Sequence, residues 1–263
     1  MNHDKESLTP QAQILELRVV FLEDDKDDPS LSILIDGRSV FETSHTAGFI
    51  GFYPDGMLAD GGALSVPSSP RRVALYRCSC GEPGCGVVAP RVSVEEGVVQ
   101  WSDFRDYTGV FDDPTLDPET ESMYLGPDGG HLLPIGDMVF DRVQYESEVE
   151  RARLDRTWES PARETARLVE AALHADRESF ERNGRRIGWV SYPWWSATRS
   201  GWLIETRRQF SDDHVRSSWD HIEQRIAEVR TEPASPPEQA ADILRQLRAV
   251  SIDQWPSVYP SSI

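Results

Sequence analysis

The chain has 263 residues, a formal net charge of −18 and a hydrophobic content of 38%. A chain of this length can bury one large core or two modest ones. No stretch approaches the roughly 18 apolar residues that cross a bilayer, and the polar first ten residues lack the apolar core of a signal peptide. We therefore expect a cytoplasmic protein that does not bind membranes. The charge also disfavours direct binding to nucleic acid, because its backbone is itself anionic.

The negative charge is distributed unevenly along the chain. Residues 1–143 contain 25 acidic and 10 basic residues, whereas residues 144–263 contain 20 and 17. Such a break in charge composition indicates a change of structural part. We therefore expect two parts, an acidic one at 1–143 and a nearly balanced one at 144–263.

The first part is predicted to be rich in β-strands. Residues 13–22 are rich in Ile, Leu and Val, as a strand requires. Asp36-Gly37 lies between two apolar runs, and this dipeptide accepts the positive φ angles of a two-residue hairpin turn. Further strands are expected at residues 73–78 and 87–94, the second reversing at the Glu-Glu-Gly of residues 95–97.

The second part is predicted to be helical, with a hairpin inserted. Ser160-Pro161 provides an N-cap followed by proline at the first helical position. Residues 185–192 and 201–210 are predicted to form two strands joined by a short loop. Ser235 and Glu238 have the spacing of a capping box, which predicts the start of a last helix.

Another helix is predicted to begin at Ser211. Apolar side chains recur after it at alternating steps of four and three, which is typical of an amphipathic helix: Val215, Trp219, Ile222, Ile226 and Val229. The predicted fold class is therefore α+β, with an acidic β-rich N-terminal part followed by a helix–β-hairpin–helix–helix C-terminal part.

Three cysteines form the most distinctive motif. Cys78 and Cys80 would share one face of a strand, and the Gly-Glu-Pro-Gly turn after them would return Cys85 to the same end. Three converging thiolates make a partial zinc site at about 2.3 Å from the metal. His131 is the first choice for the fourth ligand and His45 the second. The alternatives are a Cys80–Cys85 disulfide under oxidation, or buried thiols that act as small hydrophobic groups.

The loop of the predicted hairpin contains Trp194, Trp195 and Arg199. Adjacent aromatic residues on a strand point to opposite faces, so one of the two rings is expected to be more exposed. An exposed tryptophan beside an arginine is typical of protein interfaces and of sites for planar ligands. The alternative is that both rings fill the core.

An acidic run precedes the predicted hairpin at Asp36: Glu23, Asp24, Asp25, Asp27 and Asp28. Carboxylates could bind a divalent cation, but the run lacks the spacing of a calcium loop and its closing glutamate. We interpret it as a solvated loop. Its negative field suits the capture of a basic protein.

The sequence contains no Gly-x-Ser-x-Gly elbow, phosphate-binding loop, dinucleotide fingerprint or His-Glu-x-x-His motif. We therefore expect a non-enzymatic binding protein, of the adaptor, inhibitor or immunity type, that engages a basic protein partner and can also contain a small structural zinc site. The alternative is a metal- or cysteine-dependent enzyme centred on Cys78, Cys80, Cys85 and His131. A third possibility is a small-ligand sensor that uses the loop from Trp194 to Arg199.

Overall fold

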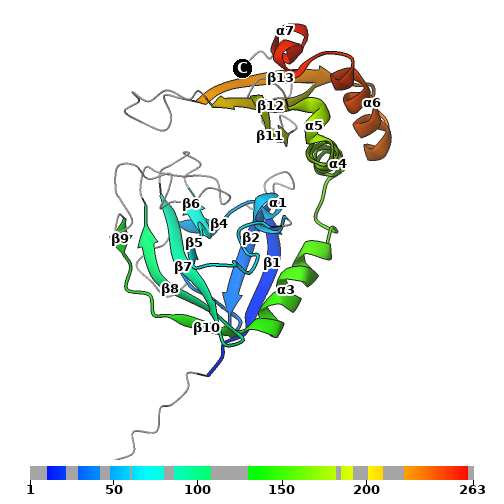
Figure 1. Cartoon of the computed structure of the whole chain (residues 1–263). Coiled ribbons are helices and arrows are strands. Elements are labelled where there is room, and N and C mark those ends of the chain that lie inside the picture. The colour runs from blue at the N-terminus through cyan, green and yellow to red at the C-terminus, as the bar shows by residue number, and fades with distance from the viewer. Residues whose placement is uncertain are drawn as a thin grey trace, which may run out of the picture. The chain divides into compact units, whose positions relative to one another are not determined.

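The computed structural model describes residues 11–21, 29–41, 48–59, 61–79, 86–107, 130–181, 185–191, 201–209 and 222–259. The contacts divide the chain into two compact units, Met1–Trp158 and Glu159–Ile263. Helices and antiparallel sheets occur together (Figure 1), which confirms the predicted α+β class.

Two antiparallel sheets build the first unit (Figure 1). The smaller sheet has the order β1 (Leu15–Phe21), β2 (Pro29–Ile35), β3 (Arg38–Ser39). The larger has the order β10 (Met138–Asp141), β8 (Val98–Asp106), β7 (Val87–Glu95), β6 (Tyr76–Cys78), β4 (Phe49–Gly51), with β5 (Arg71–Arg72) on β7 and β9 (His131–Leu132) on β8. The described residues of this unit also form α1 (Pro54–Met57) and α3 (Arg142–Leu154).

Two tight turns follow directly from local sequence. Asp36 and Gly37 have φ angles of 51° and 75°, and they join β2 to β3 as the Asp-Gly pair predicts. Glu96 and Gly97, at 47° and 84°, connect β7 to β8 in the same way. Positive φ at both central residues matches the right-handed twist of the flanking strands, so these hairpins are confirmed.

The two sheets of the first unit are connected on both sides of the β1–β2 ribbon. The amide of Leu31 on β2 donates to the carbonyl of Phe52, 3.0 Å away, just after β4. Ahead of β1, the amide of Gln13 donates to the carbonyl of Val139 on β10 at 2.7 Å. The sheets therefore enclose one core, whose largest fully buried side chains include Trp101, Tyr107, Tyr145, Phe52, Phe104 and Phe140.

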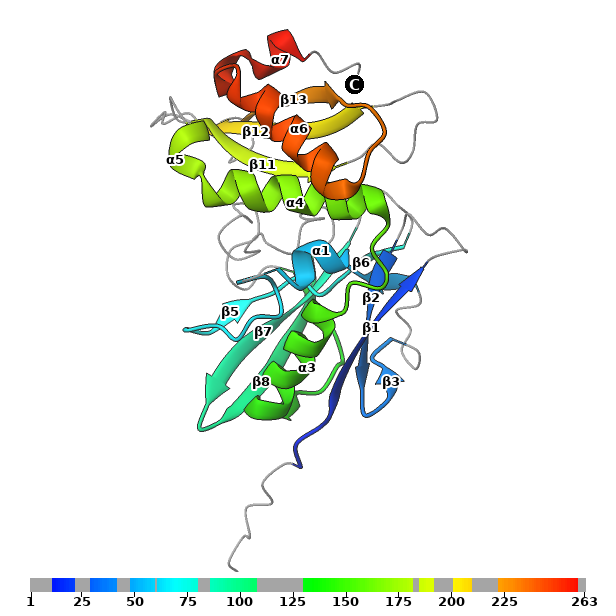
Figure 2. The ribbon, with the colours of Figure 1, turned by 90° about the vertical axis from the view of Figure 1, so that its right-hand side faces the viewer.

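The second unit is a three-stranded antiparallel sheet with helices on one face (Figure 2). In chain order it contains α4 (Pro161–Ala175), α5 (Arg177–Phe180), β11 (Arg185–Ser191), β12 (Gly201–Gln209), β13 (Ile222–Arg230), α6 (Pro236–Arg248), the 3₁₀ turn η3 (Ile252–Gln254) and α7 (Trp255–Val258). Val169 of α4 and Ile243 of α6 pack with Ile204 of β12 in its core. The predicted helix starts are confirmed, because Ser160 caps α4 and Ser235 forms a capping box with Glu238 on α6.

The helix predicted from Ser211 to Val229 is wrong over the described part of that range. Residues Ile222–Arg230 are strand β13, paired along its whole length with β12. The buried residues of β13 do not follow the helical spacing of four and three. Ala227 and Val229, two positions apart, both pack in the core with the helices, as alternate residues of a strand do. Pairing with a strand about twenty residues away overrides a local helical pattern. The second unit therefore contains a third strand where a helix was expected.

Helix α3 belongs to the first unit, although the predicted parts divided the chain after residue 143. It contacts β1, β8 and β10. In the described part of the chain, no helix combines the length and the apolar character needed to span a bilayer.

Candidate binding groove

Helix α3 is attached to the first unit mainly by polar side chains that reach one edge of a strand. Few of its side chains are buried; Tyr145 packs edge-on against Trp101, with ring centroids 6.0 Å apart, and Ala152 is the other buried residue. Asp141 accepts a hydrogen bond from the amide of Gln144 at 2.9 Å and so caps the start of the helix. From there α3 runs alongside the edge of β1 that faces away from β2 (Figure 1).

Side chains of α3 take the place of a neighbouring strand along the first half of this edge. The side-chain amide of Gln144 accepts from the backbone N–H of Leu15 at 3.2 Å and donates to its carbonyl at 2.8 Å. One turn later, Glu148 accepts from the N–H of Leu17 at 2.7 Å, and Arg151 donates to the carbonyl of Leu17 at 2.6 Å. These four bonds satisfy backbone groups that would otherwise face outward unpaired.

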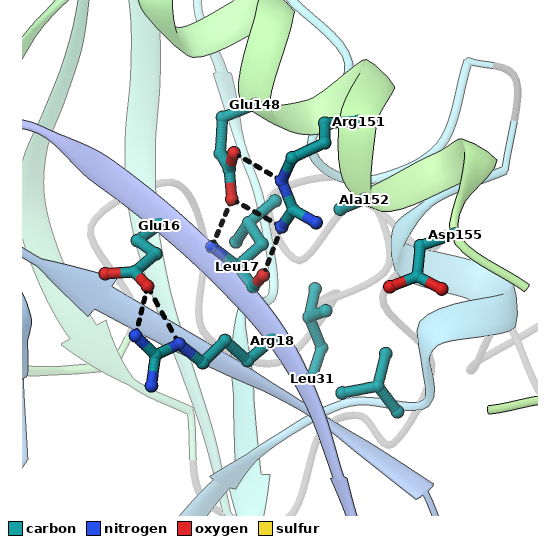
Figure 3. A pocket seen from close by; sticks show the side chains of 9 residues that line it. Glu16, Leu17, Arg18, Leu31, Glu148, Arg151, Ala152 and Asp155 are labelled. Carbon is teal, nitrogen blue, oxygen red and sulfur yellow. Dashed lines mark hydrogen bonds and ion pairs between the residues drawn. The ribbon is translucent and has the colours of Figure 1, made fainter. Parts of the chain in front are cut away.

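Glu148 and Arg151 also bind each other, at 2.8 Å (Figure 3). Burial alone would raise the pKa of Glu148, but the hydrogen bonds from Arg151 and from the Leu17 amide outweigh it and lower that pKa below its usual value. The same pair raises the pKa of Arg151, chiefly through its hydrogen bond to Glu148. Both side chains are therefore ionised at neutral pH.

A groove of about 400 Å³ opens where the helix ends. Its lining comes from β1, β2 and the end of α3 (Figure 3): Glu16, Leu17, Arg18, Val19, Leu31, Glu148, Arg151, Ala152 and Asp155. Asp155 is the C-cap of α3 and continues the polar stripe of Gln144, Glu148 and Arg151, because these positions recur at steps of four, three and four. It is the last side chain of the stripe.

Unlike Gln144, Glu148 and Arg151, Asp155 forms no hydrogen bond with the described backbone of β1. Its carboxylate accepts from the backbone N–H of Thr157 at 3.1 Å and from its hydroxyl at 2.7 Å. These bonds, the hydroxyl bond first, lower the pKa of Asp155. On the other side of the groove, Arg18 binds Glu16 through its Nε at 2.8 Å. The groove thus contains three carboxylates and two guanidinium groups, each guanidinium bound to a glutamate.

Comparisons of the whole chain with models of known protein families, with curated proteins and with solved structures find no match. The site is therefore interpreted from its own geometry.

The predicted zinc ligands are only partly placed by the structure. Cys78 is half-buried at the end of β6, and His131 is exposed on β9; Cys80, Cys85 and His45 lie outside the described residues. Strands β7 and β8 separate Cys78 from His131 in the sheet, and three spacings of about 4.8 Å amount to roughly 14 Å. Within the described ranges, no three His, Cys, Asp or Glu side chains could hold a metal ion. The zinc site stays a prediction about the cysteine turn.

The predicted partner-binding residues also lie outside the described residues: Asp24, Asp25, Asp27, Asp28, Trp194, Trp195 and Arg199.

A second polar cluster in the first unit has a structural role. Arg72 on β5 is 2% exposed and donates to the carbonyls of Ala89 and Asp103 at 3.0 and 2.6 Å. Asp103 has a φ of 47° and lies beside a register shift between β7 and β8. Although burial alone would raise the pKa of Asp103, hydrogen bonds from Arg72 and Arg105 lower it. This cluster holds an irregular strand pair together and leaves no group free for a ligand.

Sequence reasoning did not identify Gln144, Glu148, Arg151 or Asp155. Their helical spacing was readable, but a polar stripe on a charged helix is most simply interpreted as a solvated face. What distinguishes these residues is the strand edge beside them, which is more than 120 positions away in sequence.

Proposed function

We propose that this chain is a non-enzymatic binding protein, of the adaptor, inhibitor or immunity type, whose first unit engages a basic protein partner in the cytoplasm. A structural zinc ion at the cysteine turn is a separate and compatible proposal. The observation that carries the proposed function is the uncompensated negative charge of the first unit.

This charge is concentrated in one compact unit. Residues 1–158 contain 29 acidic and 13 basic residues, and residues 159–263 contain 16 and 14. Six arginines of the first unit bind carboxylates within the same unit: Arg18 with Glu16, Arg72 and Arg105 with Asp103, Arg142 with Glu146, Arg151 with Glu148, and Arg153 with Glu150. The charge of each of these arginines is therefore compensated by a carboxylate of the same unit.

A field of this sign attracts a basic protein from a distance and speeds its association. Two stretches contribute most to it, residues 22–28 and 108–129, which together contain 11 acidic residues and one basic residue. A surface that only kept the protein dispersed would have the same charge. Docking differs from a role in solubility in two ways: a particular partner binds, and binding depends on acidic residues at particular positions.

The test is a pull-down from the source organism's lysate at low salt, repeated at about 0.5 M salt, where the screening length falls to a few Å. A partner that is basic and is lost at high salt supports the proposal. The decisive variant replaces four acidic residues: Asp24→Asn, Asp25→Asn, Asp27→Asn and Asp28→Asn. The control makes the same change of net charge at exposed positions elsewhere: Glu95→Gln, Glu96→Gln, Glu178→Gln and Glu232→Gln.

Peripheral charges act on association more than on dissociation. The decisive variant should therefore slow association of the recovered partner about fivefold or more at low salt, and the control should change it less than twofold. Equal recovery and equal association rates for both variants, with no effect of salt, would rule out docking through this charge.

A further inference from the structure

We propose that the open half of the β1 edge binds an extended segment of the basic partner as an additional β-strand. This inference rests on the proposed function and specifies how the partner is held.

The open half begins at Val19. In an antiparallel ladder, alternate residues direct their backbone N–H and C=O groups away from the partner strand. Leu15 and Leu17 do so on β1, since their groups bind α3. Val19 and Phe21 follow in the same phase. Within the described residues, no hydrogen bond reaches the outward N–H or C=O of Val19, because α3 has ended and Asp155 is bound to Thr157.

The groove supplies what an added strand requires beyond these backbone groups. The apolar part of its lining, where a side chain of the incoming strand can be received, consists of three buried residues, Leu17, Leu31 and Ala152, and half-buried Val19. Val20 and Phe21, at the open end of β1, are 41% and 38% exposed. Strand addition uses main-chain hydrogen bonds for affinity and pockets for alternate side chains for specificity.

Charge selects a basic occupant. Arg18 and Arg151 are each bound to a glutamate of the lining, and Asp155, which attracts Arg151 electrostatically without a direct ion pair in the described structure, brings the lining to three carboxylates against two guanidinium groups. A lysine or arginine on the incoming strand would meet a lining in which carboxylates outnumber guanidinium groups. A second copy of this chain is disfavoured, because it also has a net charge of −18.

The test uses a fluorescent ten-residue peptide of alternating valine and lysine as the probe. Its comparison is a glycine–lysine peptide of equal charge, which has little tendency to form a strand. The decisive variant is Val19→Pro. It removes the outward N–H but no bond of the β1–β2 ladder, a position at which edge strands accept proline. Val19→Thr is the matched control, because it keeps the N–H and the branched shape.

The valine–lysine peptide should bind the unchanged protein and Val19→Thr equally, and bind Val19→Pro about tenfold more weakly. Asp155→Asn, which can still accept from Thr157, should weaken binding about threefold at low salt, whereas Glu178→Gln should not. Peptide binding should also slow hydrogen exchange at the amides of Val19 and Phe21 in the unchanged protein. If Val19→Pro does not fold, this hydrogen-exchange measurement tests by itself whether the peptide binds at the β1 edge.

Three results would overturn the inference. Equal binding of the peptide to folded Val19→Pro would show capture by charge alone, which leaves the proposed function intact. Unchanged amide exchange at Val19 and Phe21 with the peptide bound would place it elsewhere. A dimer that Val19→Pro converts to monomer would identify a second copy as the occupant. The proposed function fails separately, if the salt-dependent pull-down recovers no basic partner.

Discussion

The β1–β2 ribbon of the first unit has two long edges, and they are closed in different ways. On the β2 edge the closure is backbone to backbone, through the Leu31 amide and the Phe52 carbonyl. On the β1 edge it is side chain to backbone, through Gln144, Glu148 and Arg151 of α3. The backbone closure requires two backbone segments to approach each other closely. The side-chain closure requires a helix whose polar residues recur at steps of three and four.

This difference explains why one edge is left partly open. A strand rises about 6.6 Å for every two residues, whereas a helix rises about 5.4 Å for every turn of 3.6 residues. A stripe on a helix can therefore stay level with alternate strand residues for only a few turns. Here the helix ends at Leu154, and Val19 is the first residue beyond its reach. Closure by side chains therefore leaves the last residues of the β1 edge, from Val19 to Phe21, without a partner from α3, and this segment is the candidate binding site.

The largest effect is expected at the backbone closure. A Cβ on Gly51 would overlap the carbonyl oxygen of Leu31 and lie 2.9 Å from its carbonyl carbon. Because both contacts are with backbone, Gly51→Ala should lower the free energy of unfolding by about 3 kcal/mol, or prevent folding. The measurement is the urea midpoint. Gly136→Ala, with no atom within 4 Å of its new Cβ, is the control and should change little; equal midpoints for the two variants would contradict this closure.

A smaller effect is expected at the charged part of the side-chain closure. Glu148→Ala removes the acceptor of the Leu17 amide and the carboxylate partner of Arg151, and should cost about 2 kcal/mol in urea unfolding. The folded-state pKa of Glu148 lies below the unfolded value of about 4.3. Its carboxylate thus stabilises the fold above that pH, and the contribution is lost as the pH falls through the folded pKa.

Glu148→Gln tests this pH dependence separately from the loss of a hydrogen-bond acceptor. Below about pH 4.5, the free energy of unfolding of this variant should fall less steeply with decreasing pH than that of the unchanged protein. Glu146→Gln, on the same helix and exposed, is the control and should leave the profile as it is. If both variants lose stability in acid as steeply as the unchanged protein, Glu148 does not contribute to closure through its charge.

The smallest effect is expected at the neutral part of the closure. Gln144→Ala removes two hydrogen bonds to Leu15, near the start of β1, and should cost about 1 kcal/mol. Hydrogen exchange at the Leu15 amide should become faster, while exchange in β12 stays unchanged. Gln100→Ala, which removes an exposed bond to Asp137, is the matched control. An unprotected Leu15 amide in the unchanged protein would show that α3 does not close this edge.

Local chemistry determined several features of this protein from its sequence alone. The Asp36-Gly37 turn, the Ser160 cap and the Ser235–Glu238 box each depend on a few adjacent residues whose conformational preferences are strong, so their positions could be predicted. The charge difference along the chain was likewise a property of composition.

Only the tertiary structure decided the identity of β13 and the position of the groove. The apolar pattern of residues 222–230 suited a helix, and pairing with β12 made it a strand, because the energy of a paired and buried strand exceeds a local preference. Likewise Gln144, Glu148, Arg151 and Asp155 are an ordinary polar stripe until the fold sets them against β1, across more than 120 residues of sequence. Contacts between residues so far apart form only when the chain is folded, and no local pattern specifies them.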